Sequence, residues 1–431
     1  MSNETTKTAV PKLRFPEFEG AKEWKTETLG EISEIVRGGS PRPIENFITT
    51  APDGLNWLKI GDVAPEAKYI FRTQQKVNRG ALSKTREVSP GDLILSNSMS
   101  FGRPYIMKTK SCIHDGWIAI RQIADDVLTD YLYYAISSES SQSYFLANAA
   151  GAAVLNLNAE RIKLLPLSIP PFVEQQKIAA ILSSLDDLLT AQNAKLAALQ
   201  AHKRGLMQGL FPAEGETVPK LRFPEFQDAA EWEKLPIGGK VNLLSGYPFK
   251  SSEISEDASG IPLMRGINVT SGFIRHNQDI DRFFLGDSKK LEKFRVVTDD
   301  LLIGMDGSKV GKNSALITEF DSGSLLIQRV ARLRAKPHTS IQFVYQQINS
   351  STFHAYVDRV NTSGGIPHIS ASQINEFEIY FPCWEEQQKI ADCLTSLDNR
   401  ITAQTQKIEA LRLHKKGLMQ GLFPTAAEPT A

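Results

Sequence analysis

Hydrophobic and polar positions follow the same helical pattern twice in this 431-residue chain. Residues 174–212 read EQQKIAAILSSLDDLLTAQNAKLAALQAHKRGLMQGLFP, and residues 386–424 repeat 26 of these 39 positions. Apolar residues step by alternating four and three, the spacing that keeps one side of an α-helix against a partner. The predicted seam consists of Ile178, Leu182, Leu185, Leu189, Gln192, Leu196 and Leu199 in the first copy, and of Ile390, Leu394, Leu397, Ile401, Gln404, Ile408 and Leu411 in the second.

Polar residues interrupt both seams at the same places, and Gln192 and Gln404 are one such pair. A polar group in a coiled-coil seam costs stability but fixes register and partner, so we expect these glutamines to face each other or a shared neighbour. Two ordinary core helices would explain the apolar stripe but not the duplicated polar positions. Each helix is expected to close on a glycine and the GLFP turn, giving a rod of roughly 50 Å.

A second repeat shows that the whole chain is built from two units of roughly 210 residues. The segment VPKLRFPEF occurs at residues 10–18 and again, unchanged, at residues 218–226. Between the repeats the sequences diverge, but both contain short Val-, Ile- and Leu-rich runs bounded by Gly, Pro, Asn or Asp, which are typical of strands. We therefore predict an α+β fold with an internal two-fold repeat. The predicted segments are a first globular domain at 1–165 (repeated segment 10–24), a first helix region at 166–215, a second globular domain at 216–378 (repeated segment 218–232) and a second helix region at 379–431.

Composition narrows the possible functions. The 49 basic and 49 acidic residues balance, which argues against a uniformly basic nucleic-acid coat but leaves local patches open. No apolar run approaches a membrane span and the N-terminus lacks the apolar core of a signal peptide, so we expect a cytoplasmic protein without membrane contact. Cys112, Cys383 and Cys393 are too few and scattered for disulfides or zinc, and are interpreted as reduced packing residues.

Catalytic signatures are missing from the sequence. Residues 304–313, GMDGSKVGKN, fail the phosphate-loop pattern because Asp306 occupies the first glycine position and Asn313 follows Lys312. We find no dinucleotide fingerprint, nucleophile elbow or H-E-x-x-H motif. His114 and Asp115 are neighbours with no second partner in view, and His114 is interpreted as a turn residue. We therefore expect no catalytic residue, no metal site and no bound cofactor in this chain.

Binding chemistry is better supported, in loops at corresponding places of the two units. Arg reads guanine edges, Asn and Gln read adenine, and Lys or Ser hold phosphates. Any one of these residues alone could equally be a solvated loop residue. The candidate DNA-binding residues are Arg37, Ser40, Arg42, Lys59, Asn97, Ser98, Ser100 and Arg103 in the first unit, and Tyr247, Lys250, Arg265, Ser308, Lys309, Lys312 and Asn313 in the second.

The chain resembles the specificity subunits of type I restriction-modification systems along almost its whole length. The residues that carry the resemblance are IPPFVEQQKIAAILSSLDDLL at 169–189, YFPCWEEQQKIADCLTSLDNRI at 380–401, and the doubled VPKLRFPEF. The resemblance implies two target recognition domains that each read half of an asymmetric, interrupted DNA site, separated by two antiparallel spacer helices. It also implies a frame that docks two methyltransferase subunits, and through them restriction subunits, with S-adenosylmethionine, ATP and Mg on those partners.

Two other interpretations remain at this stage. A coiled-coil scaffold whose globular domains bind proteins would also need a duplicated frame, and it would fail to shift a bipartite DNA sequence selectively. A stand-alone nuclease or methyltransferase is disfavoured by the missing motifs, and turnover by the isolated chain would support it.

Overall fold

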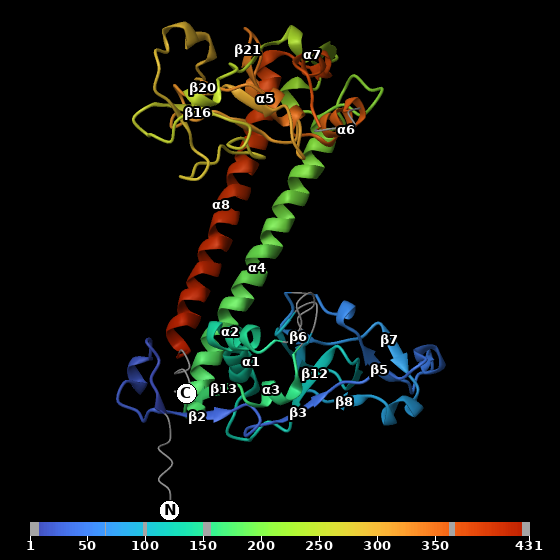
Figure 1. Ribbon diagram of the computed structural model, residues 1–431. Helices are drawn as coiled ribbons and strands as arrows, with labels where there is room; N and C mark the ends of the chain where they lie inside the picture. Colours follow the sequence, from blue (N-terminus) through green and yellow to red (C-terminus); the bar gives the residue numbers. More distant parts are fainter. Residues whose placement is uncertain (1–7, 65, 98–100, 150–156, 362–366, 425–431) are drawn as a thin grey trace, which may run out of the picture. The chain divides into compact units, whose positions relative to one another are not determined.

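The computed structural model describes residues 8–64, 66–97, 101–149, 157–361 and 367–424, and it divides into two compact units (Figure 1). Unit 1 comprises Met1–Asn193 and Gln406–Ala431, and unit 2 comprises Ala194–Thr405. Each unit therefore contains the first half of one long helix and the second half of the other. The two units are defined by which residues pack together, and they do not correspond to the four predicted segments. The boundaries of those segments therefore stay predictions.

The described residues of unit 1 form three sheets, with strand orders β1-β2-β13, β3-β12-β9-β10-β6 and β4-β7-β5-β11-β8. Its strands are β1 (Thr8–Ala9), β2 (Trp24–Thr28), β3 (Glu34–Arg37), β4 (Ile48–Thr49), β5 (Leu55–Leu58), β6 (Tyr69–Ile70), β7 (Gln75–Val77), β8 (Arg86–Val88), β9 (Leu93–Ser96), β10 (Pro104–Met107), β11 (Ser111–Ile113), β12 (Trp117–Arg121) and β13 (Pro166–Ile169). Its shorter helices are α1 (Thr129–Ser137), α2 (Glu139–Ala147) and α3 (Ala159–Lys163).

Unit 2 has sheets with strand orders β14-β22, β15-β21-β18-β19 and β17-β16-β20. Its strands are β14 (Glu233–Pro236), β15 (Val241–Ser245), β16 (Ile261–Met264), β17 (Phe283–Phe284), β18 (Leu301–Gly304), β19 (Ser314–Leu316), β20 (Leu325–Leu326), β21 (Val330–Ala335) and β22 (Glu378–Phe381). Its shorter helices are α5 (Ile341–Ile348), α6 (Ser351–Val360) and α7 (Ala371–Glu376).

The two units share a central sheet despite their different sequences. The order β3-β12-β9-β10 in unit 1 corresponds to β15-β21-β18-β19 in unit 2, with antiparallel pairing throughout. The middle strands β9 and β18, LILS and LLIG, are buried at every position, which explains their unbroken apolar sequence. The predicted mixture of helices and strands in an internal repeat is confirmed.

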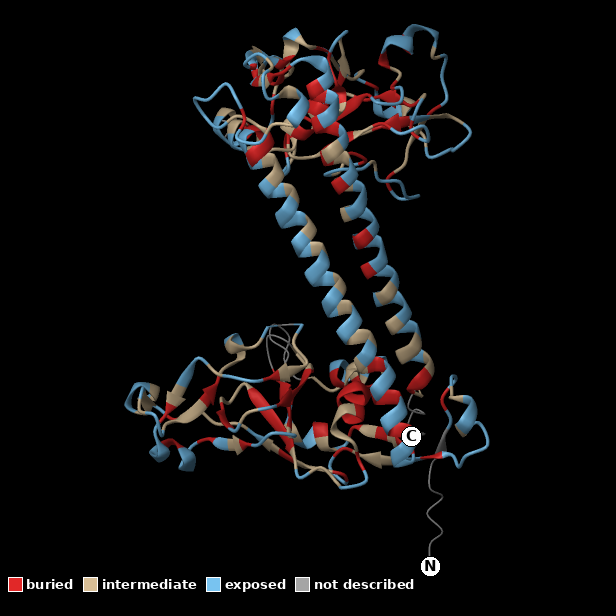
Figure 2. Ribbon diagram, turned by 180° about the vertical axis from the view of Figure 1, so that it is seen from behind, coloured by how far each residue is buried: buried red, intermediate tan, exposed pale blue. Residues whose placement is uncertain are grey.

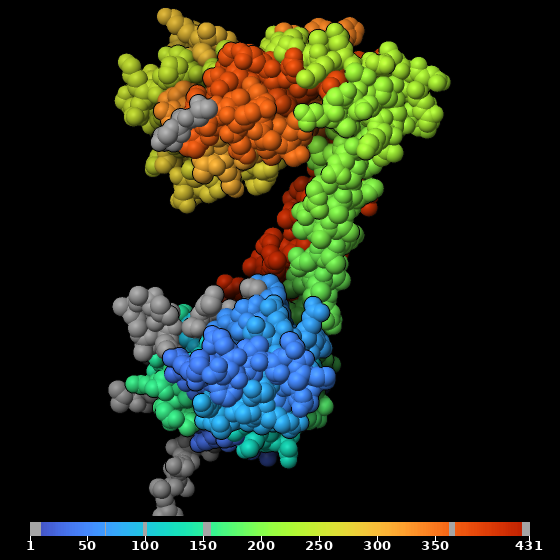
Figure 3. Space-filling model, turned by 90° about the vertical axis from the view of Figure 1, so that its right-hand side faces the viewer, coloured from blue at the N-terminus to red at the C-terminus, as the bar shows by residue number. Residues whose placement is uncertain are grey.

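The long helices are α4 (Phe172–Leu210) and α8 (Trp384–Leu422), with 39 residues each. At about 1.5 Å per residue each is about 58 Å long. Buried or half-buried positions recur between exposed ones along both helices, and they include all the predicted seam residues (Figure 2). In Figure 3 the outer side chains of α4, in green, are uncovered along much of the helix.

Both helices continue past the glycine at which the sequence pattern predicted their ends. Gly209 and Gly421 lie within the last turns of α4 and α8. A Cβ atom at Gly209 would lie 2.5 Å from Leu221, and one at Gly421 would lie 2.9 Å from Leu13. The backbone N–H groups of these leucines donate to the two glycine carbonyls at 2.8 and 2.9 Å. The glycines therefore permit close approach of the repeated VPKLRFPEF segment and do not cap the helices.

A buried ion pair joins that repeated segment to the start of a long helix in each unit. The Arg14 guanidinium donates two hydrogen bonds of 2.8 Å to Glu174 in unit 1, and Arg222 makes the same pair of bonds to Glu386 in unit 2. The glutamate side chains are only 1% exposed. A bidentate pair of this kind fixes direction as well as distance.

The glutamine after each of these glutamates ties the globular domain to the same helix. Gln175 Oε1 accepts the N–H of Leu128 at 2.8 Å, and Gln387 Oε1 accepts the N–H of Ser340 at 3.1 Å. Both side-chain amides also donate 2.9 Å bonds to the carbonyl of a preceding proline. The EQ motif is therefore the junction between a helix and its domain.

A second junction in unit 1 lies about three turns further along α4. The Asp186 carboxylate accepts a 2.6 Å bond from the Tyr134 hydroxyl and forms an ion pair with Lys415 of α8. Lys68 donates to Tyr134 Oη at 3.2 Å and to Ser183 Oγ at 2.8 Å. Burial, followed by the bond to Asp186, raises the pKa of Tyr134 well above its usual value. The tyrosine thus stays a neutral donor.

Unit 2 repeats the aspartate–lysine pair of this second junction, with a glutamine in place of the tyrosine. Asp398 of α8 accepts a 2.6 Å bond from Lys203 of α4, and a 2.9 Å bond from the Gln346 amide. Gln346 lies on α5, which corresponds to the helix that carries the tyrosine in unit 1. In each unit the beginning of one long helix is therefore paired with the last part of the other.

The cysteine prediction was wrong at one position. Cys112 is buried and Cys393 is half-buried, but Cys383 is exposed because it lies just before α8, at the surface of the junction. In the part of the chain that the structure describes, no helix is long and apolar enough to cross a membrane.

Candidate nucleic-acid interface

Four chain segments meet at one end of the central sheet in each unit, and the first is the glycine after β3 or β15. Gly38 and Gly246 occupy this place. A Cβ atom at Gly38 would lie 2.2 Å from the His114 carbonyl oxygen, and one at Gly246 would lie 2.0 Å from that of Ile327. Only glycine allows the backbones to approach this closely, so the geometry explains two glycines in otherwise different loops.

The second segment is the pair of residues immediately before β12 or β21, which we call the pre-strand pair. It is Asp115–Gly116 in unit 1 and Gln328–Arg329 in unit 2. The carbonyl of the second residue accepts an N–H from the third segment, which follows β9 or β18. The donors are Asn97 at 3.0 Å and Met305 at 2.9 Å. The two pairs therefore hold the same position with unrelated side chains.

The fourth segment brings a cation to the same end of each unit. Lys59 directly follows β5, and Arg265 directly follows β16. The carbonyls just before them, of Leu58 and Met264, each accept a 3.1 Å hydrogen bond from the residue that precedes the pre-strand pair. Two residues that the sequence suggested separately are thus at matched positions.

In unit 1 the candidate residues gather around Asp115. Its carboxylate accepts a 2.9 Å bond from Ser40 and lies 3.7 Å from the Arg42 guanidinium. Its backbone carbonyl accepts bonds from Arg37 at 3.1 Å and from Asn97 at 3.3 Å. The sequence showed no second partner for the neighbours His114 and Asp115, whereas the structure gives Asp115 several partners. Its partners come from strands far away in the sequence, so no local pattern could reveal them.

The other candidates of unit 1 have no hydrogen bond or ion pair with Asp115 among the described residues, or lie outside those residues. Arg103 faces Glu66 at 3.6 Å, and Lys59 is half-buried. Ser98 and Ser100 lie outside the described residues. Unit 1 therefore supports four of its eight candidates as one cluster.

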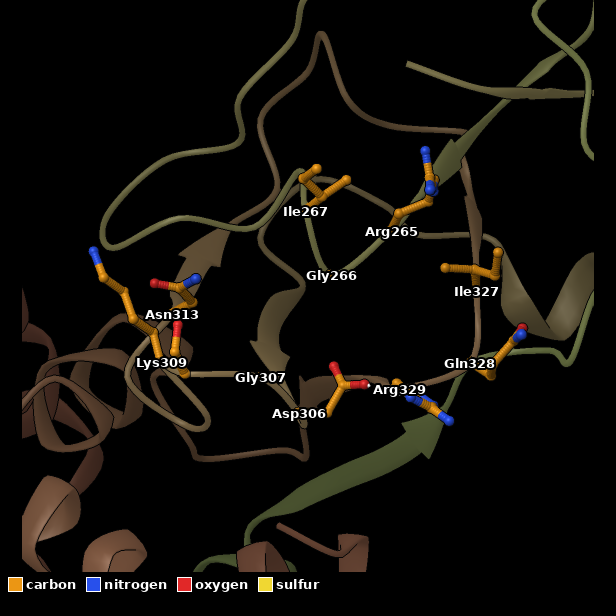
Figure 4. A pocket seen from close by; sticks show the side chains of 11 residues that line it. Arg265, Gly266, Ile267, Asp306, Gly307, Lys309, Asn313, Ile327, Gln328 and Arg329 are labelled. Carbon is orange, nitrogen blue, oxygen red and sulfur yellow. Dashed lines mark hydrogen bonds and ion pairs between the residues drawn. The ribbon is translucent and has the colours of Figure 1, made fainter. Parts of the chain in front are cut away.

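Unit 2 has an open pocket of about 600 Å³ at the matching end (Figure 4). In Figure 4, Lys309 and Asn313 lie on one side of the hollow, and Arg265 lies on the other. Four predicted residues line this pocket, but most of the lining was not predicted. The lining residues are Arg265, Gly266, Ile267, Asp306, Gly307, Ser308, Lys309, Asn313, Ile327, Gln328 and Arg329.

Three candidates of unit 2 do not line the pocket. Tyr247 packs its ring edge-on against Phe249, with centroids 4.9 Å apart. Lys312 forms a 2.8 Å ion pair with Asp358, and Lys250 is exposed. Their side chains are respectively a packing group, a paired cation and a solvated cation in this structure.

An ion pair that the sequence did not suggest lies on the rim of the pocket. Asp306 Oδ2 accepts a 2.9 Å bond from Arg329 Nη1, shown as a dashed line in Figure 4. Asp306 was noted only because it breaks the phosphate-loop pattern. Arg329 could have been found from its position directly before β21, which corresponds to that of Gly116 before β12 in unit 1. This correspondence is recognised only once the strand pairing is known.

Metal chemistry finds no support in the described segments, which contain no cluster of three or more His, Cys, Asp or Glu side chains able to hold an ion. The pocket is instead lined by arginine, lysine, amide and hydroxyl groups. These are groups that contact nucleic-acid bases and phosphates.

Comparison with known proteins identifies the family. The model described as "Type I restriction modification DNA specificity domain" matches residues 21–201 and 230–413, one match in each half of the chain. The type I restriction enzyme MjaVIII specificity subunit of Methanocaldococcus jannaschii is 23% identical over 95% of this chain and 93% of its own length. The EcoAI specificity subunit of Escherichia coli is 30% identical over 33% of this chain and 24% of its own length.

Solved structures share the fold. The S subunit of a type I restriction-modification system from M. genitalium matches 97% of this chain and 100% of its own, with 15% identity and a TM-score of 0.62. A second structure, described under complex assembly and conformational transition of the type I R-M system, covers 92% of this chain and 96% of its own, with 14% identity and a TM-score of 0.52. Since the family matches most of both halves, the chain belongs to the type I restriction-modification DNA specificity family.

Proposed function

We propose that this chain is the DNA-recognition subunit of a type I restriction-modification complex, with one unit reading each half of an asymmetric, interrupted site. The observation that carries this proposal is the matched loop end of the two units. Both hold the same backbone hydrogen bonds, yet Asp115–Gly116 in one unit corresponds to Gln328–Arg329 in the other. A shared backbone arrangement that carries different side chains in the two units is suited to reading two different half-sites.

The chemistry of the loops fits bases and phosphates. Arginine pairs with guanine through two donors, amides pair with adenine, and carboxylates accept from cytosine. Unit 1 offers Arg37, Arg42 and Asp115, while unit 2 offers Arg265, Lys309 and Arg329. Because the formal charge of the chain is zero, we expect these local groups, and not the whole surface, to hold the DNA.

We propose further that the chain is not itself catalytic. Two methyltransferase subunits would dock on its helical frame and carry S-adenosylmethionine, and restriction subunits bound through them would use ATP and Mg. The relatives are named specificity subunits, which supports this division of labour. A complex that acts on chromosomal DNA would work in the cytoplasm.

The long helices are proposed to form an antiparallel coiled-coil spacer that sets the distance between half-sites. Four residues inserted after Thr190 would lengthen α4 by about 6 Å. At about 3.4 Å per base pair this adds one to two base pairs to the spacer. The same insertion after Thr402, the matched position of α8, should act alike. Four substitutions at either place without insertion are the control. An unchanged spacer length in methylome sequencing would contradict the proposal that the long helices set the distance between half-sites.

The recognition proposal is tested with the full-length chain purified together with its methyltransferase. We expect it to retard a duplex carrying one bipartite sequence far more strongly than random DNA, at a stated salt concentration. Salt-sensitive binding without sequence preference reports phosphate contacts alone and would contradict recognition. Absence of any DNA shift, with proteins retained by the globular domains, would favour a scaffold.

A further inference from the structure

We propose that Arg329 selects a guanine in the half-site read by unit 2, and that Asp306 is its positioning residue. This inference rests on the proposed function, since it assigns one base contact within DNA recognition. Neither residue belongs to the set predicted from the sequence. Three features of the structure support the inference: the backbone conformation of Arg329, its ion pair with Asp306 and the contrast with unit 1.

The backbone of Arg329 adopts a conformation that side chains disfavour. Its φ is +68°, in the left-handed region, whereas the φ of Gly116, at the matched place in unit 1, lies outside that region. Non-glycine residues at positive φ are uncommon, and such strain concentrates at functional sites. The Arg329 side chain is 63% exposed, so burial of a core group does not explain the conformation. We infer that the turn holds this conformation in order to place the Arg329 guanidinium at the protein surface.

Asp306 holds one side of that guanidinium. Its Oδ2 accepts from Arg329 Nη1 at 2.9 Å, and its own side chain is 24% exposed. An arginine has five N–H donors in a rigid fork, so one bond to Asp306 leaves donors for a second partner. Guanine presents two acceptors, N7 and O6, that match two of them. Because the ion pair with Asp306 already restrains the guanidinium, less conformational entropy is lost when the guanidinium binds a base.

The other cations of the pocket suit different tasks. Arg265 Nη1 donates a 3.0 Å bond to the Ile280 carbonyl, which ties it to the backbone. Lys309 is exposed and has no ion pair with any of the described residues. A mobile ammonium is a point charge that suits a phosphate, whereas the arginine fork suits a base edge. Lys309 is therefore the phosphate contact against which Arg329 is compared.

Unit 1 cannot use the matched position in this way. Gly116 has no side chain, and a Cβ atom there would lie 2.6 Å from Ile60. Any effect of Arg329 should consequently be confined to one half-site. The other half-site serves as a control within the same molecule.

The test maps methylated sites in cells that express the full-length chain and its methyltransferase. Arg329→Gly suits the positive φ, so the turn should fold as before. We expect discrimination at one guanine position of one half-site to fall about tenfold or more, with the other half-site and the spacer unchanged. Arg329→Gln should shift preference at that same position toward adenine, since glutamine pairs with the adenine edge.

Three further variants separate positioning and phosphate roles from base reading. Asp306→Asn should relax the same guanine position to a smaller extent, and Asp306→Glu should restore preference by retaining the carboxylate. Lys309→Ala should weaken all sequences alike and reduce the slope of log affinity against log salt by about 1. Lys234→Ala removes an exposed cation, paired with Glu378 on β14 and β22 and outside the pocket, and should change nothing.

The outcomes distinguish this inference from the recognition proposal beneath it. If the unaltered chain gives no bipartite motif, DNA recognition itself fails. If it does, and Arg329→Gly either keeps the full motif or weakens all sequences uniformly, Arg329 is no base reader. Relaxation of both half-sites, or of a position that is not guanine, would overturn the inference equally. Thermal unfolding checks the fold, and Arg329→Gln decides the matter should Arg329→Gly unfold.

Discussion

The junctions and the loop ends of the two units are repeated in different ways. At the junctions the side chains and their contacts recur together, as in the pairs of Arg14 with Glu174 and of Arg222 with Glu386. At the loop ends only the backbone bonds recur, while Asp115 in one unit corresponds to Gln328 in the other. Attachment is thus kept constant, whereas the loop ends that we propose to bind DNA differ between the units.

This difference changes the interpretation of the repeated sequence. The family resemblance implied a frame that docks two methyltransferase subunits, but several of the repeated residues make contacts within the chain itself. Glu174 accepts from Arg14, Gln175 accepts from the domain backbone, and Gly209 admits Leu221. The identity of the two frames is therefore explained in part by contacts inside each unit.

Breaking the junction should have the largest effect. Removing one member of a buried ion pair typically costs about 3–5 kcal/mol, so Glu174→Ala and Glu386→Ala should each lower unfolding stability by that order. Glu174 also accepts from the Trp24 indole at 3.2 Å, whereas the Trp232 indole nitrogen has no partner among the described residues. Glu174→Ala should therefore cost more. Denaturant titration measures both.

The control for that experiment is an exposed pair next to the same helix. Glu17 lies 3.0 Å from Lys177, and both side chains are about half exposed. Glu17→Ala should leave stability nearly unchanged. Equal, small losses in all three variants would show that the buried pairs do not hold the junctions.

The glycines at the loop ends offer an intermediate effect. Gly38→Ala and Gly246→Ala force a Cβ to within 2.2 and 2.0 Å of a backbone oxygen. Overpacking of this kind costs about 1–3 kcal/mol. Each variant should impair binding at its own half-site only, measured with duplexes in which one half-site is scrambled. Gly239→Ala, with nothing within 4 Å of the added Cβ, is the control. Loss at both half-sites would contradict independent reading.

The smallest expected effect is a difference in alkylation rate between two cysteine thiols, measured with the fold intact. Burial, with a smaller contribution from the Glu87 charge, raises the pKa of the Cys112 thiol to about 11. Because the thiolate is the reactive form, Cys112 should alkylate far more slowly than the exposed Cys383 at pH 8. Mass spectrometry of timed reactions checks this. Rapid modification of Cys112 without unfolding would contradict its burial.

The sequence predicted the features that depend on local or repeated patterns. The four-three spacing of Ile178, Leu182 and Leu185 predicted a helix, and the doubled VPKLRFPEF predicted two units. Both patterns can be recognised along the sequence without knowledge of strand pairing. The structure describes helices of 39 residues that include these positions.

Features that depend on strand pairing were missed. Asp115 meets Ser40 and Arg37 only because β12 lies beside β3 in the sheet. Arg329 meets Asp306 only because β21 lies beside β18. The spacing of these residues in the sequence carries no trace of either contact. Candidate loops could thus be named in advance, but their most informative side chains could not.

We propose that the two units read two different half-sites. The most direct test sequences the methylated adenines in cells that express this chain with its methyltransferase. We predict one motif made of two unlike half-sites with a fixed, unspecific spacer, in which Gly246→Ala weakens one half only. A single continuous motif, two identical halves, or methylation without sequence preference would contradict the account.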